Sequence, residues 1–162
     1  LDGSARYSQY FDLQQHIFKS VVQRCARLGG RVLSIHSRAA AREVLDTLEA
    51  NPGFGVAVLH WFTDSPTLLR RAVESGCWFS VGPAMLETAN GRKLAAAMPP
   101  DRVVPESDGP FAKVGGAPLM PWDANTVTVK LAEIWGVKQE AALKGLRSNG
   151  LCLARLLTGG GS

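Results

Sequence analysis

The fold of this chain is decided by residues 31–60, which read RVLSIHSRAAAREVLDTLEANPGFGVAVLH. Two short runs rich in Val, Leu and Ile, Arg31 to Ile35 and Gly55 to His60, have the composition of buried β-strands. Between them a helical pattern runs from Arg38 to about Glu49 and is broken at Asn51-Pro52-Gly53. A strand, a helix and a second strand joined by short connections predict a parallel β/α unit.

The same unit recurs on both sides of this stretch. A helix is predicted from Asp12, as its N-cap, to Leu28, and Gly29-Gly30 ends it. The further elements expected are a helix opened by Ser65-Pro66, a strand at 77–81, a looser helical segment at 84–98, a strand at 102–105, a loop at 109–120, and helices at 124–135 and 138–157. The pattern predicts an α/β fold, and its spacing fits both a partial barrel and an open doubly wound sheet. A complete (β/α)8 barrel takes about 250 residues.

A chain of 162 residues with ordinary apolar and charged content is expected to form one soluble domain. Its 18 Lys and Arg against 14 Asp and Glu give a net charge of only +4, which permits contact with phosphates without arguing for it. Cys25, Cys77 and Cys152 are far apart in apolar or helical stretches, which favours reduced core thiols and a cytoplasmic location. No apolar run is long enough to predict a membrane span. The chain opens without Met, so we expect it to begin inside a longer protein. We expect residues 1–158 to form the domain and 159–162, GGGS, to be a linker or tag remnant.

Polar residues stand where three of the predicted strands end. His36 and His60 end the first two strands of the quoted stretch, and Asp108 follows the strand at 102–105 and Glu106. In parallel α/β folds the carboxyl ends of strands carry the functional residues. Imidazole and carboxylate groups suit zinc, manganese or iron, and carboxylates also suit magnesium. A single His at a strand end is more often an ordinary hydrogen-bonded group. With three such residues in register, a metal site and ordinary hydrogen-bonded groups are both open interpretations.

Local sequence around these residues resembles the TatD family of metal-dependent hydrolases. Ile35-His36-Ser37-Arg38 resembles the family's I-H-S-R, 59–62 resembles H-x-F, and 106–110 resembles E-T-D-S-P. Leu1-Asp2 is similar to the end of G-E-I-G-L-D, and 147–153 is similar to T-x-N-x-x-x-L-F. The five segments occur in the family's order, so the resemblance spans almost the whole chain and implies the C-terminal part of a TIM-type (β/α)8 barrel.

The resemblance implies roles for individual residues. His36, His60 and Asp108 would bind a divalent metal, Mg2+ or Mn2+ or else Zn2+, and Asp108 and Glu106 would be the catalytic carboxylates. The implied activity is cleavage of DNA, single-stranded or nicked. The family's H-x-H and the Glu of G-E-I-G-L-D are not in this sequence, so the chain itself lacks about half of the ligands that the resemblance implies.

Two further residues have open interpretations. Arg38 either binds phosphate beside His36 or pairs with a neighbouring carboxylate. Trp61 is either a core residue or a surface on which a base stacks. Phe62 and Trp78 are expected in the core, and His16 on the solvated side of its helix.

A narrower resemblance covers residues 31–38, 59–62 and 76–86. These segments are most similar to the TatD-like nuclease of the Qat anti-phage defence system, which implies DNA as substrate and other proteins of that system as partners. The alternatives to a nuclease are a metal-dependent amide, ester or D-aminoacyl hydrolase, and an inactive partial barrel that serves as a binding or scaffold module.

Overall fold

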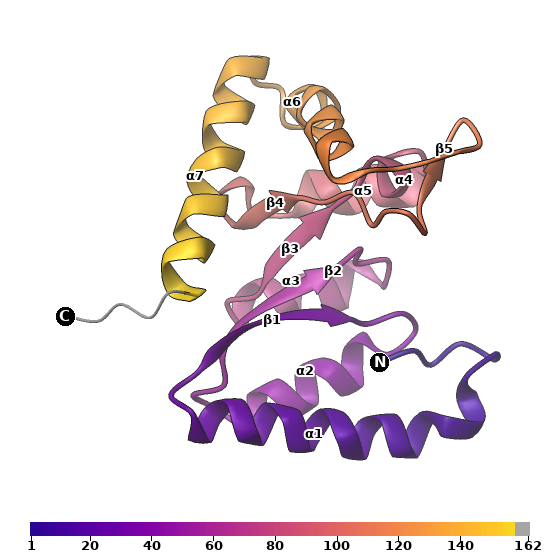
Figure 1. The fold of residues 1–162 in the computed structure, drawn as a ribbon, viewed down its shortest axis with the longest axis vertical. Helices are drawn as coiled ribbons and strands as arrows, with labels where there is room; N and C mark the ends of the chain where they lie inside the picture. Colours follow the sequence, from indigo (N-terminus) through magenta and orange to yellow (C-terminus); the bar gives the residue numbers. More distant parts are fainter. Residues whose placement is uncertain (158–162) are drawn as a thin grey trace.

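The computed structural model describes residues 1–157, which contain a parallel sheet of four strands in the order β1-β2-β3-β4 (Figure 1). The strands are β1 (Arg31–His36), β2 (Gly55–His60), β3 (Trp78–Val81) and β4 (Val103–Pro105). Each strand is connected to the next by one or two helices, so the predicted α/β class with parallel β/α units is confirmed.

Helices precede, connect and follow the strands. Their bounds are α1 (Phe11–Arg27), α2 (Ala41–Glu49), α3 (Pro66–Glu74), α4 (Pro83–Leu86), α5 (Ala89–Ala97), α6 (Val127–Trp135) and α7 (Gln139–Leu157), with short 3-10 turns at Ser8–Tyr10, Pro100–Arg102 and Pro121–Thr126. The expected 159–162 linker lies outside the described residues.

One face of the sheet forms the core with the helices. Ile35, Leu59 and Phe79 belong to a single buried apolar cluster with side chains from the helices. Successive residues of a strand point to opposite faces, so these odd-numbered positions face the helices while His36, His60 and Ser80 face the other way. Phe79 and Phe62 are fully buried and meet edge to face, with ring centroids 6.2 Å apart.

Helix α7 closes the end of the sheet at which the strands begin, and it contacts both edge strands, β1 and β4 (Figure 1). Asn149 on this helix is buried, and its Nδ2 donates to the carbonyl oxygens of Pro100 at 2.8 Å and Val103 at 2.7 Å. The segment of 147–153 that resembles a family motif therefore ties α7 to the start of β4, far from the polar strand ends.

Several expected elements differ in the structure. Helix α1 begins at Phe11 after Tyr10, so Asp12 is not its N-cap, although its charge in the first turn still favours the helix. Helix α2 begins at Ala41, because Arg38 forms a β-bridge with Asp2 and Ala39 has a φ of 49°.

The helical segment expected at 84–98 is two helices. The side chain of Thr88 accepts a hydrogen bond from the N–H of Gly91 and starts α5 anew. The loop expected at 109–120 contains an antiparallel hairpin, β5 (Lys113–Val114) and β6 (Ala117–Pro118). Gly115 and Gly116 both have positive φ, as a two-residue hairpin turn requires.

The apolar side chains of α1 are only partly buried. Val22 and Cys25 lie in the interior, but Leu13, Ile17 and Val21 are about half exposed. The helix predicted here is confirmed, and part of its apolar face is exposed.

The three cysteines differ in their burial. Cys25 and Cys77 are buried, and burial raises the pKa of the Cys77 thiol to about 11, which keeps it in the unreactive thiol form. Cys152 is exposed, so the expectation that it is a core thiol is wrong. Among residues 1–157, no helix has the length and apolar character needed to cross a membrane.

Candidate metal and hydrolytic site

The polar strand ends come together on the sheet face away from the helices. His36 lies opposite His60 in the register of β1 and β2, and His60 lies opposite Ser80 of β3. The two imidazole ring centroids are 6.1 Å apart. Glu106 follows β4 directly, and its N–H donates to the carbonyl oxygen of Val81 at 3.0 Å. The parallel register thus brings residues up to 70 positions apart to one edge of the sheet.

Glu106 holds the His60 ring. Its Oε2 lies 2.6 Å from His60 Nδ1 and accepts a hydrogen bond from the hydroxyl of Ser80 at 2.5 Å. The contact from Glu106 raises the pKa of the His60 imidazole, burial opposes this, and the negative charges of Glu106 and Asp108 raise it further. With a proton on Nδ1, the other ring nitrogen, Nε2, is left free for a proton or a cation.

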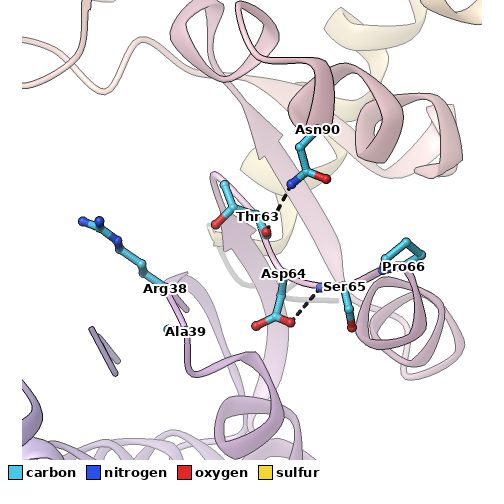
Figure 2. Close-up of a pocket in the computed structure, with 7 residues that line it drawn as sticks. All are labelled: Arg38, Ala39, Thr63, Asp64, Ser65, Pro66 and Asn90. Atoms are coloured by element: carbon cyan, nitrogen blue, oxygen red, sulfur yellow. Dashed lines mark hydrogen bonds between the residues drawn. The ribbon is translucent and has the colours of Figure 1, made fainter. Parts of the chain in front are cut away.

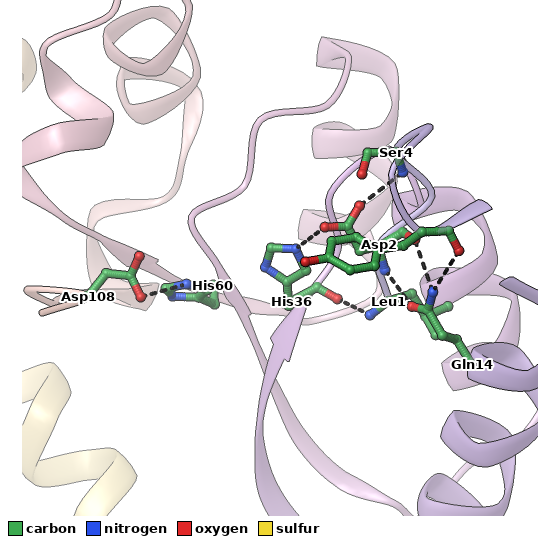
Figure 3. A network of polar contacts seen from close by, with 8 residues as sticks. Leu1, Asp2, Ser4, Gln14, His36, His60 and Asp108 are labelled. Carbon is green, nitrogen blue, oxygen red and sulfur yellow. Dashed lines mark hydrogen bonds and ion pairs between the residues drawn. The ribbon is translucent and has the colours of Figure 1, made fainter. Parts of the chain in front are cut away.

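The free nitrogen faces a second carboxylate. His60 Nε2 lies 3.4 Å from Oδ1 of Asp108 (Figure 3). A neutral imidazole nitrogen and a carboxylate oxygen are both acceptors, so this approach is favourable only when a proton or a cation lies between them. The buried Oε1 of Glu106 has no hydrogen-bond partner within the described structure, which leaves one more acceptor at the same place.

Asp2 is a site residue that sequence reasoning missed. Its Oδ2 lies 3.4 Å from His36 Nε2, and Figure 3 shows Asp108, His60, His36 and Asp2 in a row. Burial acts to raise the pKa of Asp2, but hydrogen bonds from Ser4 and the contact with His36 lower it overall. Gln14 on α1 fixes the backbone of Asp2 in both directions, accepting from its N–H and donating to its carbonyl. The only signal in the sequence was the place of Asp2 at the end of a family segment.

A cavity of about 670 Å3, the site cavity, opens at this end of the sheet. His36, His60 and Asp108 line it together with both sequence-predicted binding residues, Arg38 and Trp61. Its remaining lining residues are Thr63, Thr88 and Phe111. The structure thus gathers five of the predicted residues around one cavity. Glu106 does not line it but hydrogen-bonds the ring of His60.

Arg38 and Phe111 have free side chains in the site cavity. Within residues 1–157 no carboxylate is recorded as paired with the exposed guanidinium of Arg38, so the ion-pair interpretation is wrong for this structure. Phe111 is 86% exposed and was missed by sequence reasoning, because a single aromatic in a Gly- and Pro-rich loop carries no periodic signal.

Backbone strain is concentrated at the same strand ends. In the described part of the chain, three residues other than glycine have positive φ: Ala39 after β1, Trp61 after β2 and Asp108 after β4, at 49°, 42° and 51°. Such conformations are costly for residues with a Cβ and cluster at functional sites. These three positive-φ residues change the direction of the backbone close to His36, His60 and Asp108.

The loop after Asp108 is held tightly against the site. The N–H of Ala112 donates to the carbonyl oxygen of Asp108, and the N–H of Leu119 donates to Ala112, both at 2.9 Å. A Cβ on Gly109 would lie 1.7 Å from the carbonyl oxygen of Leu119. This close approach leaves no room for a Cβ at position 109, where the E-T-D-S-P segment has serine.

The residues fit a divalent metal in kind but not in convergence. Nitrogen and oxygen donors from His36, His60 and Asp108 line one cavity, and the His60–Asp108 approach calls for a positive charge. However, nowhere in residues 1–157 do three His, Cys, Asp or Glu side chains lie close enough together to hold an ion. The metal roles of these residues therefore stay a prediction.

Comparisons with known proteins place the chain among curated relatives. Human deoxyribonuclease TATDN3 is 26% identical to the chain over 160 residues, which cover 94% of the chain and 57% of the human protein. A protein of Mycobacterium tuberculosis described as an uncharacterized metal-dependent hydrolase TatD is 33% identical over 88 residues, 53% of the chain and 33% of that protein. The chain thus spans from a third to somewhat over half of the length of these relatives.

The fold has solved counterparts. The Escherichia coli TatD homologue YJJV superposes with a TM-score of 0.84 at 23% identity, over 94% of the chain and 60% of YJJV. An uncharacterized amidohydrolase from Saccharomyces cerevisiae superposes with a TM-score of 0.81 at 14% identity, over 94% of the chain and 62% of that protein. These matches establish a fold of the TIM-barrel type. The model of the family described as TatD related DNase matches residues 1–152, and the chain therefore belongs to that family.

Proposed function

We propose that this protein cleaves phosphodiester bonds of DNA as a metal-dependent hydrolase. The observation that carries the proposal is the approach of His60 Nε2 to Asp108 at 3.4 Å in a cavity that His36 also lines. Family membership implies a divalent metal and relates the chain to deoxyribonucleases. Because the chain spans only part of its relatives, the activity of the whole protein belongs to the proposal.

Each residue of the site has a proposed task. His36 and His60 would hold the metal, and Asp108 would either complete this set or accept a proton from the attacking water at Oδ1. Glu106 keeps the proton of His60 on Nδ1 and so keeps Nε2 available. A divalent ion held there would supply positive charge against the phosphate oxygens and would lower the pKa of water. Magnesium or manganese fits a set rich in carboxylates, and zinc fits the two imidazoles.

Single-stranded or nicked DNA is the proposed form of the substrate. Trp61 and the exposed Phe111 both line the site cavity, and aromatic faces stack on unpaired bases. Bases in an intact duplex are already stacked on one another and are not presented to such side chains.

A role in anti-phage defence in the cytoplasm, beside other proteins of the Qat system, is a further part of the proposal. It rests on the resemblance of residues 31–38, 59–62 and 76–86 to the nuclease of that system.

One observation favours a second candidate, an inactive barrel segment that serves as a binding module. It is the lack of three converging metal donors in residues 1–157. No feature of the site favours a metal-dependent amide or ester hydrolase over a nuclease, but such an enzyme would use the same metal ligands and carboxylates.

The proposal is tested by DNA cleavage with Mg2+ or Mn2+, comparing the unaltered protein with His60→Ala and with His16→Ala as matched control. We expect His60→Ala to lose activity about 100-fold or more, because it removes a group that acts on the transition state. His16 is exposed on α1 and its replacement is expected to change nothing.

Single-stranded DNA, nicked duplex, intact duplex and an aryl ester serve as substrates in the same assay. Turnover of the ester alone would favour the acyl hydrolase, and turnover of none would favour the binding module. DNA cleavage that is equal in His60→Ala and the unaltered protein would refute the proposed site.

A further inference from the structure

A second, shallow and open cavity of about 500 Å3, the flanking cavity, adjoins the site cavity, and Arg38 and Thr63 line both (Figure 2). It lies over the loops that follow β1 and β2, and Asn90 at the start of α5 forms its far side. A ligand that extends beyond the site cavity across these two residues enters the flanking cavity.

The charges in the flanking cavity are unevenly placed. Arg38 is the only cation among its lining residues, and it stands on the boundary with the site cavity. Inside the flanking cavity Asp64 carries a negative charge, and its Oδ1 accepts a hydrogen bond from the N–H of Ser65 at 2.7 Å. An anionic group is therefore favoured beside Arg38 and disfavoured beside Asp64.

The exposed surface around Asp64 and Asn90 suits a neutral group with several hydrogen-bonding atoms. Asn90 offers an amide, whose Nδ2 lies 3.4 Å from the carbonyl oxygen of Thr63, and Asp64 has a second carboxylate oxygen. Amide, hydroxyl and carboxylate groups together match the N–H, O–H and carbonyl groups of a nucleoside. Figure 2 shows Arg38 on one side of this space and Asn90 on the other.

We propose that the flanking cavity is a second nucleotide subsite, in which Arg38 binds the phosphate that joins a nucleotide in the site cavity to the nucleoside beside Asp64 and Asn90. The inference rests on the proposed function, since it assumes that a nucleotide occupies the site cavity. It makes the ligand an oligonucleotide rather than a mononucleotide.

The test compares the affinity of the protein for thymidine 5′-phosphate and for the dinucleotide d(pTpT), measured by calorimetry in EDTA so that no turnover is needed. A charge-assisted hydrogen bond to the second phosphate predicts that the dinucleotide binds about tenfold more tightly. Asn90→Glu is expected to abolish this gain, because it adds a second carboxylate to the lining of the flanking cavity. Glutamate is well suited to the first turn of α5, so folding is preserved.

Ser148→Glu is the matched control, because it adds the same charge at an exposed position of α7, at the opposite end of the sheet. It is expected to keep the tenfold gain. No gain with length in the unaltered protein, or an equal gain in Asn90→Glu, would overturn the subsite. A gain that Asn90→Glu removes, in a protein that cleaves no DNA when metal is added, would retain the subsite and reject only the nuclease activity.

Discussion

Replacing Gly109 with alanine is expected to lower DNA cleavage about 100-fold while the protein stays folded. The new Cβ would lie 1.7 Å from the carbonyl oxygen of Leu119, so the loop must move. Asp108 is the preceding residue and is tied to this loop through Ala112, so its carboxylate moves with it. A displacement of about 1 Å at a reacting group is enough for a loss of this size.

The control for Gly109→Ala is Gly145→Ala on α7, where the added methyl group meets nothing within 4 Å. This variant is expected to cleave DNA normally and to be slightly more stable, as alanine favours helices over glycine. Limited proteolysis gives a second measurement that does not depend on activity: the bonds at 109–120 should be cut faster in Gly109→Ala alone. Unchanged proteolysis and unchanged cleavage would show that the loop accommodates the side chain without cost.

Phe79→Ala is expected to lower the free energy of unfolding by about 3–5 kcal/mol, the usual cost of removing a buried phenylalanine. Phe79 is fully buried on β3 and packs edge to face against Phe62 after β2. Total stabilities of domains are only about 5–15 kcal/mol, so this change removes a large part of the margin. Urea unfolding followed by circular dichroism measures the difference.

Phe111→Ala is the matched control, since the same side chain is lost from an 86% exposed position. We expect it to change the free energy of unfolding by less than about 0.5 kcal/mol. Equal destabilisation by the two variants would contradict the assignment of the core to the helix-covered face of the sheet.

The strands and their polar ends were predictable because parallel, buried strands leave a strong local signal. The run Gly55–His60 is continuous, apolar and bounded by glycine and a polar residue, and the structure gives the same bounds. His36 and His60 then fall in register, because a parallel pair of similar length aligns its carboxyl ends.

Other features depend on contacts that the local sequence does not contain. The pairing of Asp2 with His36 requires the chain start to lie beside β1, which α1 and Gln14 bring about over a long sequence distance. The exposure of Leu13 and Ile17 depends on which elements cover α1, and periodicity alone says only that they share a face. The closeness of Gly109 to Leu119 likewise follows from the tertiary course of the loop.

The central claim, that His36 and His60 belong to a divalent metal site, is tested most directly by titrating the metal-free protein with Mn2+ in a calorimeter. The unaltered protein and His16→Ala are expected to bind the ion with a defined stoichiometry, and the double variant His36→Ala, His60→Ala is expected to lose this binding. Mn2+ binding of equal strength and stoichiometry in the double variant, or no binding by the unaltered protein, would contradict the claim.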